Sequence, residues 1–451
     1  MRRSRKLVTS VIVIVAVVAV AVGYLLLRPS DPTRFAAGRR VDLAAYHEKD
    51  PTGVPASLAA ADPIARGEYL TRAADCVSCH TAPGAKAYAG GRRFKLPFGN
   101  LYSPNITPDK ETGIGDWSDN DFVRAMHAGI GRGGEHLYPA FPYTSYTLLT
   151  RGDVLAIKNY LFSLKPVRNA PPANDLQFPY NQRYLMFFWN LLFNPGHRFQ
   201  PNIDQTAEWN RGAYLVEALG HCGDCHTPRN LLQGLKSSRK FAGATIEGWK
   251  AYNITPDPRT GIGAWSDDQL VRYLSSGHAD GRGSAGGPMG EAVDNSLRFL
   301  VQDDVRAMSP YLRSVPPISE GIEVAANPGQ PANSQASKTT GLGGGGDGVG
   351  WHVFAGACAS CHNWDGRGVV SPYTSLIGSR SLNDPEAVNL TQVILHGSGL
   401  HTPHGPAFMP AFGKAYTDAE IAGLVTYVTG RFGAGTAPIT PNEIAKRRQE
   451  D

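Results

Sequence analysis

The sequence predicts an all-α protein in which three small helical modules follow one another behind an N-terminal transmembrane helix. Three observations support this fold class: a long uncharged apolar segment near the N-terminus, a five-residue cysteine and histidine pattern that occurs three times, and a duplicated stretch of sequence. The length of 451 residues exceeds what one hydrophobic core usually organises. Gly (51) and Pro (33) are frequent, which indicates extensive loops rather than long regular sheets.

The first thirty residues predict where the protein resides. Residues 7–27 carry no charge and, at about 1.5 Å per residue, would form a helix long enough to cross a bilayer. Four basic residues precede this segment, so the positive-inside rule places the N-terminus in the cytoplasm and the remainder in the periplasm. We therefore expect a single inner-membrane anchor; the alternatives are a long signal peptide that is cleaved and, with less support, twin-arginine export.

The remaining composition excludes two broad classes of protein. Apolar residues make up 42% of the chain, which is enough to form packed cores and excludes disorder throughout. The net charge is +5, and the four basic residues before the apolar segment supply most of it. A clustered basic face is therefore not expected, and nucleic acid is not an expected partner.

The six cysteines all lie in Cys-x-x-Cys-His patterns. A c-type haem needs two thiols, each of which reaches one vinyl group, and an adjacent imidazole for the iron; this pattern supplies them within five residues. Zinc sites, disulfides and thioredoxin-like pairs are the alternatives, but no second ligand set accompanies any copy. We expect three covalent haems c, held by the cysteine pairs Cys76 and Cys79, Cys222 and Cys225, and Cys358 and Cys361, with His80, His226 and His362 as proximal iron ligands.

Self-comparison of the chain predicts the domain organisation. Residues 105–118 and 253–266 are identical at 11 of 14 positions, at an offset of 148 residues. The pentapeptides RGEYL and RGAYL precede the first two haem motifs, so these modules are close repeats. The expected segments are an anchor at 7–27, cytochrome c domains at 57–168, 205–317 and 351–435, and a Gly-rich linker at 318–350.

The sixth iron ligands are predicted from the few methionines. Met289 and Met409 lie in the loops where the second and third haems need a thioether ligand. The repeat offset leads from Met289 back to Phe141, which cannot bind iron. The first haem is therefore expected to be five-coordinate or to take another ligand, for which Met126, His127 and His136 are the candidates.

Several other side chains have two interpretations each. Trp117 and Trp265 are either hydrogen-bond donors to haem propionates or core residues. Arg92 and Arg93 either neutralise propionates or lie on the solvated surface, which is the preferred interpretation. The apolar run 185–193 is too short to span a membrane and is expected to pack between the first two modules or to lie at a membrane interface near a quinone.

Taken together, these motifs resemble the membrane-bound three-haem cytochrome c subunits of bacterial periplasmic dehydrogenases that act on alcohols, gluconate, sorbitol or aldehydes. The segments that carry the resemblance are ARGEYL, NITPD, TGIG, HLYPAFPY, HCGDCHTPRN and GPM, within residues 60–435. The resemblance implies that Met289 and Met409 are the axial methionines. The chain departs from the alcohol dehydrogenase members at Phe141, where they have methionine, and this favours cytochrome partners of molybdenum hydroxylases acting on aldehydes or N-heterocycles.

The expected function is electron transfer rather than catalysis. We find no Ser-His-acid arrangement, phosphate-binding loop or carboxylate metal cluster in the sequence that would define a catalytic site. The resemblance implies a dehydrogenase catalytic subunit with pyrroloquinoline quinone, flavin or molybdenum as electron donor, and ubiquinone or a terminal oxidase as acceptor. The alternatives are a free-standing electron shuttle and a peroxidase-like haem enzyme that uses an open first haem.

Overall fold

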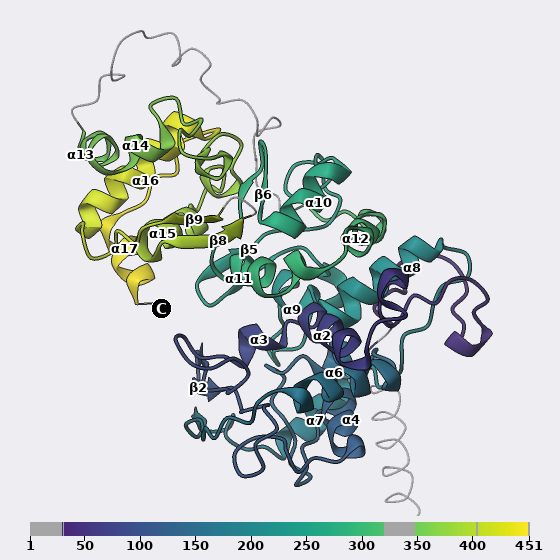
Figure 1. Ribbon diagram of the computed structural model, residues 1–451. Helices are drawn as coiled ribbons and strands as arrows, with labels where there is room; N and C mark the ends of the chain where they lie inside the picture. Colours follow the sequence, from purple (N-terminus) through teal and green to yellow (C-terminus); the bar gives the residue numbers. More distant parts are fainter. Residues whose placement is uncertain (1–28, 30, 320–347, 403–404, 450–451) are drawn as a thin grey trace, which may run out of the picture.

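The computed structural model describes residue 29 and residues 31–319, 348–402 and 405–449 (Figure 1). Below, modules 1, 2 and 3 denote residues 57–168, 205–317 and 351–435. Module 1 and the described residues that flank it contain two short 3-10 helices, six α-helices and three strands. These are η1 (Leu43–Ala45), η2 (Ala56–Leu58), α2 (Pro63–Ala73), α3 (Cys76–Cys79), β1 (Arg93–Leu96), β2 (Gly99–Tyr102), α4 (Asp119–Ala128), α5 (Tyr143–Tyr146), α6 (Arg151–Ser163), β3 (Asp175–Leu176) and α7 (Leu185–Phe193).

Module 2 repeats the order of module 1 with a longer final loop. Ser118 caps α4 and Ser266 caps α10, each in a capping box that the repeated Trp-Ser sequence places at the same point. The elements are α8 (Ala207–Tyr214), the π-helical turn η3 (Leu215–Leu219), α9 (Gly223–His226), η4 (Ser237–Arg239), β4 (Ala244–Ile246), β5 (Trp249–Ala251), α10 (Asp267–Ser276), β6 (His278–Ala279), β7 (Gly283–Ser284), α11 (Gly287–Asn295), η5 (Leu297–Phe299) and α12 (Gln302–Ser314).

Module 3 is shorter and lies beside module 2 (Figure 1). Its long helix α16 starts at the capping box of Thr417 and Glu420. The elements are α13 (Val349–Val353), the π-helical turn η7 (Phe354–Cys358), α14 (Ala359–His362), η8 (Pro372–Thr374), η9 (Arg380–Leu382), α15 (Val388–His396), β8 (Ser398–Thr402), β9 (Gly405–Met409), α16 (Asp418–Phe432) and α17 (Pro441–Arg448).

Each module is built on one crossing between its first and last helices, and a glycine makes each crossing possible. A Cβ atom at Gly67 in α2 would collide with the carbonyl oxygen of Ala156 in α6. The same collision would occur between Gly212 in α8 and Ala307 in α12, and between Gly350 in α13 and Gly423 in α16. Because only glycine allows the helix backbones to approach this closely, the glycine shared by RGEYL and RGAYL has a structural role.

Modules 1 and 2 contact each other through reciprocal tyrosine and aspartate pairs. Tyr69 of module 1 donates a 2.6 Å hydrogen bond to Asp304 of module 2, and Tyr214 of module 2 donates to Asp153 of module 1. Arg211 adds hydrogen bonds to both carboxylate oxygens of Asp304, at 2.8 and 2.5 Å. Since both partners come from matching places in the repeat, the duplication itself produces this approximately two-fold interface.

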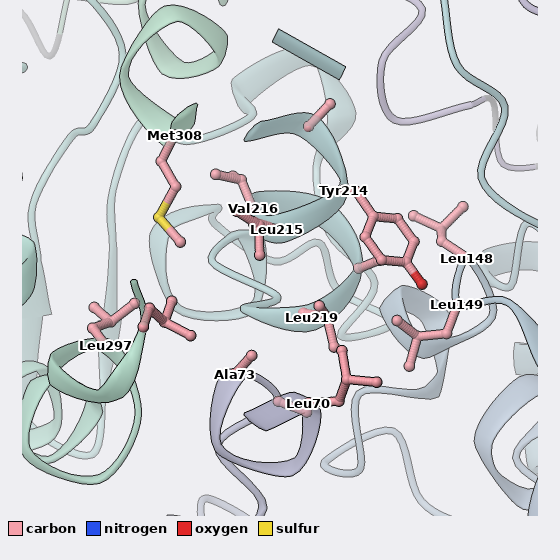
Figure 2. Close-up of a cluster of buried hydrophobic side chains, with 14 of the residues drawn as sticks. Leu70, Ala73, Leu148, Leu149, Tyr214, Leu215, Val216, Leu219, Leu297 and Met308 are labelled. Carbon is pink, nitrogen blue, oxygen red and sulfur yellow. The ribbon is translucent and has the colours of Figure 1, made fainter. Parts of the chain in front are cut away.

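The buried side chains form two separate clusters. One cluster runs continuously through modules 1 and 2, and the other lies within module 3. Figure 2 shows Leu70 and Ala73 of α2 facing Leu215 and Leu219 of η3, with Met308 of α12 nearby. Modules 1 and 2 therefore share one hydrophobic core.

The expectation of an all-α fold is wrong, because the long loops pair into small antiparallel sheets. The described residues contain one three-stranded and three two-stranded sheets. The β4–β5 hairpin turns at Glu247 and Gly248, whose φ angles of 49° and 75° fit the mirror-image turns that join twisted strands. Such hairpins need only three residues a strand, too few for alternating hydrophobicity to reveal them in the sequence.

The predicted inner-membrane location with a single N-terminal anchor is also corrected. Over residues 31–319, 348–402 and 405–449, no helix combines the length and the apolar character needed to cross a bilayer. The structure therefore gives this location no support and we withdraw it. The predicted anchor at residues 7–27 lies outside the described residues, as do residues 320–347 of the predicted linker.

Candidate haem-attachment sites

The first Cys-x-x-Cys-His motif begins directly after helix α2. Asp75, in the left-handed conformation at φ 49°, turns the chain from α2 into α3. Cys76 and Cys79 lie at the two ends of this single helical turn, and their spacing places both thiols near one face. The Ser78 hydroxyl donates a 2.6 Å hydrogen bond to Asp75 and fixes the turn.

The three histidines of the motifs have the same hydrogen-bonding pattern. The Nδ1 atom of His80 lies 2.8 Å from the carbonyl oxygen of Pro104. The same ring nitrogen lies 2.6 Å from the Tyr252 oxygen in His226 and 2.6 Å from the Thr374 oxygen in His362. Because a carbonyl oxygen only accepts, Nδ1 carries the proton, and the lone pair of Nε2 remains for a metal.

A glycine amide holds each histidine backbone in the same way. The N–H groups of Gly90, Gly243 and Gly368 donate to the carbonyl oxygens of His80, His226 and His362, respectively, at 2.8, 2.8 and 3.0 Å. All three glycines have positive φ angles, of 75°, 91° and 79°. The number of residues between histidine and glycine differs among the modules, so this common feature is not visible as a sequence spacing.

Burial favours the neutral forms of the three motif histidines and of the cysteine thiols Cys79 and Cys358. Burial lowers the pKa of His80, His226 and His362, which favours the neutral imidazole that can bind a metal. No disulfide joins any of the six cysteines, and burial raises the pKa of Cys79 to about 12 and that of Cys358 to about 11. Within the described part of the chain, no group of three or more His, Cys, Asp or Glu side chains could hold a metal ion.

The two predicted axial methionines pack against the hydrophobic clusters of their own modules. Met289 lies in the first turn of α11, and it packs against the same buried cluster as Cys222. Met409 ends strand β9 and packs against the cluster that contains Cys358. Both side chains are partly buried, and their role as iron ligands stays a prediction.

The backbones of modules 1 and 2 match up to Leu137 and Ala285, four residues before Phe141 and Met289. The N–H of Leu137 donates to the carbonyl of Gly129, and the N–H of Ala285 donates to the carbonyl of Gly277, at 2.8 and 2.7 Å. Both pairs are related by the repeat offset of 148 residues, so no gap precedes residue 137 in this region. Phe141 packs 5.6 Å, between ring centroids, from Tyr146, whose hydroxyl donates to the carbonyl of Ala74 just before the first motif.

The other candidate ligands of the first haem occupy different environments. Met126 is buried in the core shared by modules 1 and 2. The ring of His136 packs against Phe187 of α7 at 5.8 Å, and Asn194, the residue that follows α7, donates a 3.0 Å hydrogen bond to the carbonyl of His127. The choice among these residues stays a prediction.

The apolar run 185–193 forms α7, which connects modules 1 and 2. Asn190 donates to the carbonyl of Ala128 in module 1 at 2.5 Å, and the Trp189 indole donates to Leu232 of module 2 at 2.8 Å. Phe187 and Phe188 on the same helix remain 52% and 57% exposed. The helix therefore has one packed face and one exposed apolar face.

Sequence reasoning missed the role of Arg92. Its guanidinium donates to the Ser78 carbonyl within the first motif at 2.9 Å and to Glu291 of α11 at 2.5 Å, whereas Arg93 is exposed. Glu291 is 199 residues away in sequence, so no local signal could have identified the pair. Trp265 is partly buried and packs against Tyr273 and under Arg282, and Trp117 is packed against the shared core.

Residues close in sequence to two of the haem motifs take part in the contacts between the modules. Between modules 1 and 2, Tyr146 packs edge-on against His221, the residue before Cys222, at 5.5 Å. Between modules 2 and 3, Tyr373 packs against His278 at 4.8 Å and is followed by Thr374, which holds His362. Lys250 bridges to Asp384 at 3.1 Å across the same contact.

Comparisons with known proteins agree with this geometry. Residues 64–165 match the family model of cytochrome c, and residues 348–428 match that of cytochrome c oxidase, cbb3-type, subunit III. The matched models and the repeated Cys-x-x-Cys-His frame define a c-type cytochrome with covalent haem c.

Three relatives identify the family more closely. The chain is 42% identical over 376 residues to a subunit of nicotinate dehydrogenase from Pseudomonas putida, covering 82% of this chain but only 30% of that protein. It is 38% identical to the fructose dehydrogenase cytochrome subunit of Gluconobacter japonicus, covering 85% and 82% of the two chains. It is 35% identical to the gluconate 2-dehydrogenase cytochrome c subunit of Pantoea cypripedii, covering 86% and 90%. The chain belongs to the family of cytochrome c subunits of periplasmic dehydrogenases, which are electron-transfer components rather than catalytic subunits.

Proposed function

We propose that this chain carries three covalent haems c and passes electrons from a dehydrogenase catalytic subunit to ubiquinone or a terminal oxidase. The observation that carries the proposal is the threefold repetition of one frame, in which a backbone carbonyl fixes the histidine ring and a glycine amide fixes its backbone. Two family models cover modules 1 and 3, and the duplication relates module 2 to module 1. The proposed haem domains are therefore residues 57–168, 205–317 and 351–435, with a linker at 318–350.

Each proposed site uses the chain's residues in the same way. The cysteines of each motif form the thioether bonds, and the Nε2 atoms of His80, His226 and His362 bind the iron. Met289 and Met409 supply the sixth ligands of the second and third haems. When bound, haem supplies reversible one-electron chemistry, and the chain sets its potential through axial ligands, hydrogen bonds and burial.

The first site differs because Phe141 replaces the methionine. We propose that this haem is five-coordinate or has a second nitrogen ligand, His127 or His136 being candidates, and that its reduction potential lies below those of the methionine-ligated haems. Met126 is the remaining candidate. Magnetic circular dichroism that showed three His/Met haems would contradict the nitrogen and five-coordinate assignments.

The electron donor is proposed from the relatives. Those with this architecture are named for dehydrogenases of nicotinate, fructose, gluconate and alcohol, so the shared part is the cytochrome and not one substrate. Nicotinate is an N-heterocycle, and this relative, together with Phe141, supports a molybdenum hydroxylase as the donor. Quinoprotein and flavoprotein subunits are the other donor classes.

The test is to purify the full-length chain from its native host through a C-terminal tag. We expect three haems per chain, measured by the pyridine haemochrome method, and a large subunit with molybdenum, flavin or quinone cofactor in near-equal amount. Cys→Ala pairs in one motif at a time should each remove one haem, with Ser163→Ala as a matched surface control. Fewer than three haems would contradict the haem count, and repeated isolation of the trihaem chain alone would favour an independent shuttle.

A further inference from the structure

The attachment loop of the first motif touches the helix that carries the proposed sixth ligand of the second haem. Asn295, the last residue of α11, donates a 2.9 Å hydrogen bond to the Ser78 hydroxyl between Cys76 and Cys79. Four residues earlier, Glu291 accepts a 2.5 Å hydrogen bond from Arg92. One turn of α11 is thus connected to the first motif at both ends.

Arg92 is the centre of this contact. One of its terminal nitrogens reaches both the Ser78 carbonyl, at 2.9 Å, and the Glu291 carboxylate. The other lies 3.6 Å from Glu247 in the β4–β5 turn of module 2. Its side chain is only 21% exposed, and the neighbouring Asp75 carboxylate is buried beside it. A planar guanidinium can satisfy several acceptors at once, which a lysine ammonium does less well.

Helix α11 needs such support because it is short. It has nine residues and starts at Gly286 and Gly287, the latter with a φ of 54°, without a side-chain N-cap bond. Helices of this length are marginal in isolation, so tertiary contacts determine their position. On its inner side only Gly290 and Val293 are fully buried. Met289, in the first turn, therefore depends on contacts made elsewhere along the helix.

We propose that Arg92 is a positioning residue for the second haem: it holds α11 against the first attachment loop and thereby keeps Met289 at the distance needed to bind the second iron. The inference rests on the proposed role of Met289. It makes the ligation of the second haem depend on the module that carries the first.

The test compares Arg92→Ala with Arg92→Lys, with Arg93→Ala and with Met289→Ala in the full-length chain. Arg93 is the matched control, because it removes the same charge from an exposed neighbouring position. The readouts are haem content, the near-infrared charge-transfer signal of methionine-ligated ferric haem in magnetic circular dichroism, and the midpoint potential of the second haem. Met289→Ala should remove about half of the methionine signal, since two haems contribute to it.

The expected result is that Arg92→Ala keeps three haems, loses much of the same half of the signal and lowers the midpoint potential of the second haem. Arg92→Lys should retain more of the signal, and Arg93→Ala should match the unchanged protein. A normal signal and potential in Arg92→Ala, beside a reduced signal in Met289→Ala, would overturn the inference and leave the proposed function intact. An unchanged signal in Met289→Ala would instead overturn the ligand assignment, and the inference with it.

A double variant, Glu291→Gln with Asn295→Ala, tests the same contact if Arg92→Ala fails to incorporate haem. Glu291→Gln and Asn295→Ala remove the module 2 side of the same contact and leave the first motif unaltered. The double variant should lose methionine signal with three haems retained. Retention of the full signal in that variant would overturn the inference.

Discussion

Modules 1 and 2 have the same frame but different distal segments. The glycine helix crossing, the histidine bonded to a carbonyl and the serine-capped helix all recur at matching positions. Beyond Leu137 and Ala285 the modules diverge, to Phe141 before the four-residue α5 in one and to Met289 in the nine-residue α11 in the other. These shared elements form the core and hold the attachment loop, so they tolerate little change. The distal segments differ in sequence and in helix length, so their contacts differ.

The largest effect is expected from breaking the contact between modules 1 and 2 at Asp304. Asp304→Asn leaves the Arg211 guanidinium, whose side chain is 12% exposed, without its charged partner. We expect a loss of about 3 kcal/mol in the free energy of unfolding, because an uncompensated buried charge remains. Denaturant unfolding followed by circular dichroism measures it. Asp153→Asn, the reciprocal variant, should cost less, since Asp153 pairs with Tyr214 and the amide of Gly53. Equal losses of unfolding free energy in the two variants would show that the unpaired charge of Arg211 adds nothing to the effect of Asp304→Asn.

A smaller loss is expected when a helix crossing is widened. Gly212→Ala places a methyl group against the Ala307 carbonyl and should cost about 2 kcal/mol through overpacking. The matched control is Gly152→Ala in α6, where the added methyl meets only ordinary contact with Thr150. The control should be neutral or slightly stabilising, because alanine favours the helix. Thermal unfolding of both variants gives the comparison, and similar melting temperatures would contradict the role of the crossing.

Converting the first distal segment to the second tests the alignment directly. Phe141→Met should add a third methionine-ligated haem to the magnetic circular dichroism spectrum and raise the lowest of the midpoint potentials. Folding should change little, since this swap keeps an apolar side chain of similar size. A spectrum identical to that of the unchanged protein would place the sixth ligand of the first haem elsewhere.

The smallest effect concerns pH. Burial, with a contribution from the Arg198 guanidinium, lowers the pKa of His127 to about 4 from its ordinary value of 6.5. The unfolded chain therefore binds the proton more readily, and stability present above pH 6.5 should decline as the pH falls towards 4. His127→Gln should flatten this dependence, measured as denaturant midpoints at several pH values. Ser275 occupies the matching position in module 2, so this particular position can titrate only in module 1.

Particular residues show how much of the fold and of the sites the sequence could predict. The three haem motifs were predictable because each lies within five consecutive residues, and the duplication was predictable because residues 105–118 and 253–266 are identical at 11 of 14 positions. The small hairpins were missed, since their turns depend on positive φ angles at residues such as Glu247. The predicted membrane location has no support in the described residues. The haem count, the axial methionines and the acceptor stay predictions.

The sequence by itself determined the chemistry of the sites, because a Cys-x-x-Cys-His motif is a local pattern that needs no distant residue. It also determined that modules 1 and 2 share a frame, because duplicated residues form duplicated helices. Only the tertiary structure decided which groups meet across the modules: Tyr69 with Asp304, Trp189 with Leu232, and Arg92 with Glu291. These pairs are separated by 43 to 235 residues in the chain, and no local propensity specifies such contacts. These contacts follow from how modules 1 and 2 pack around their shared core.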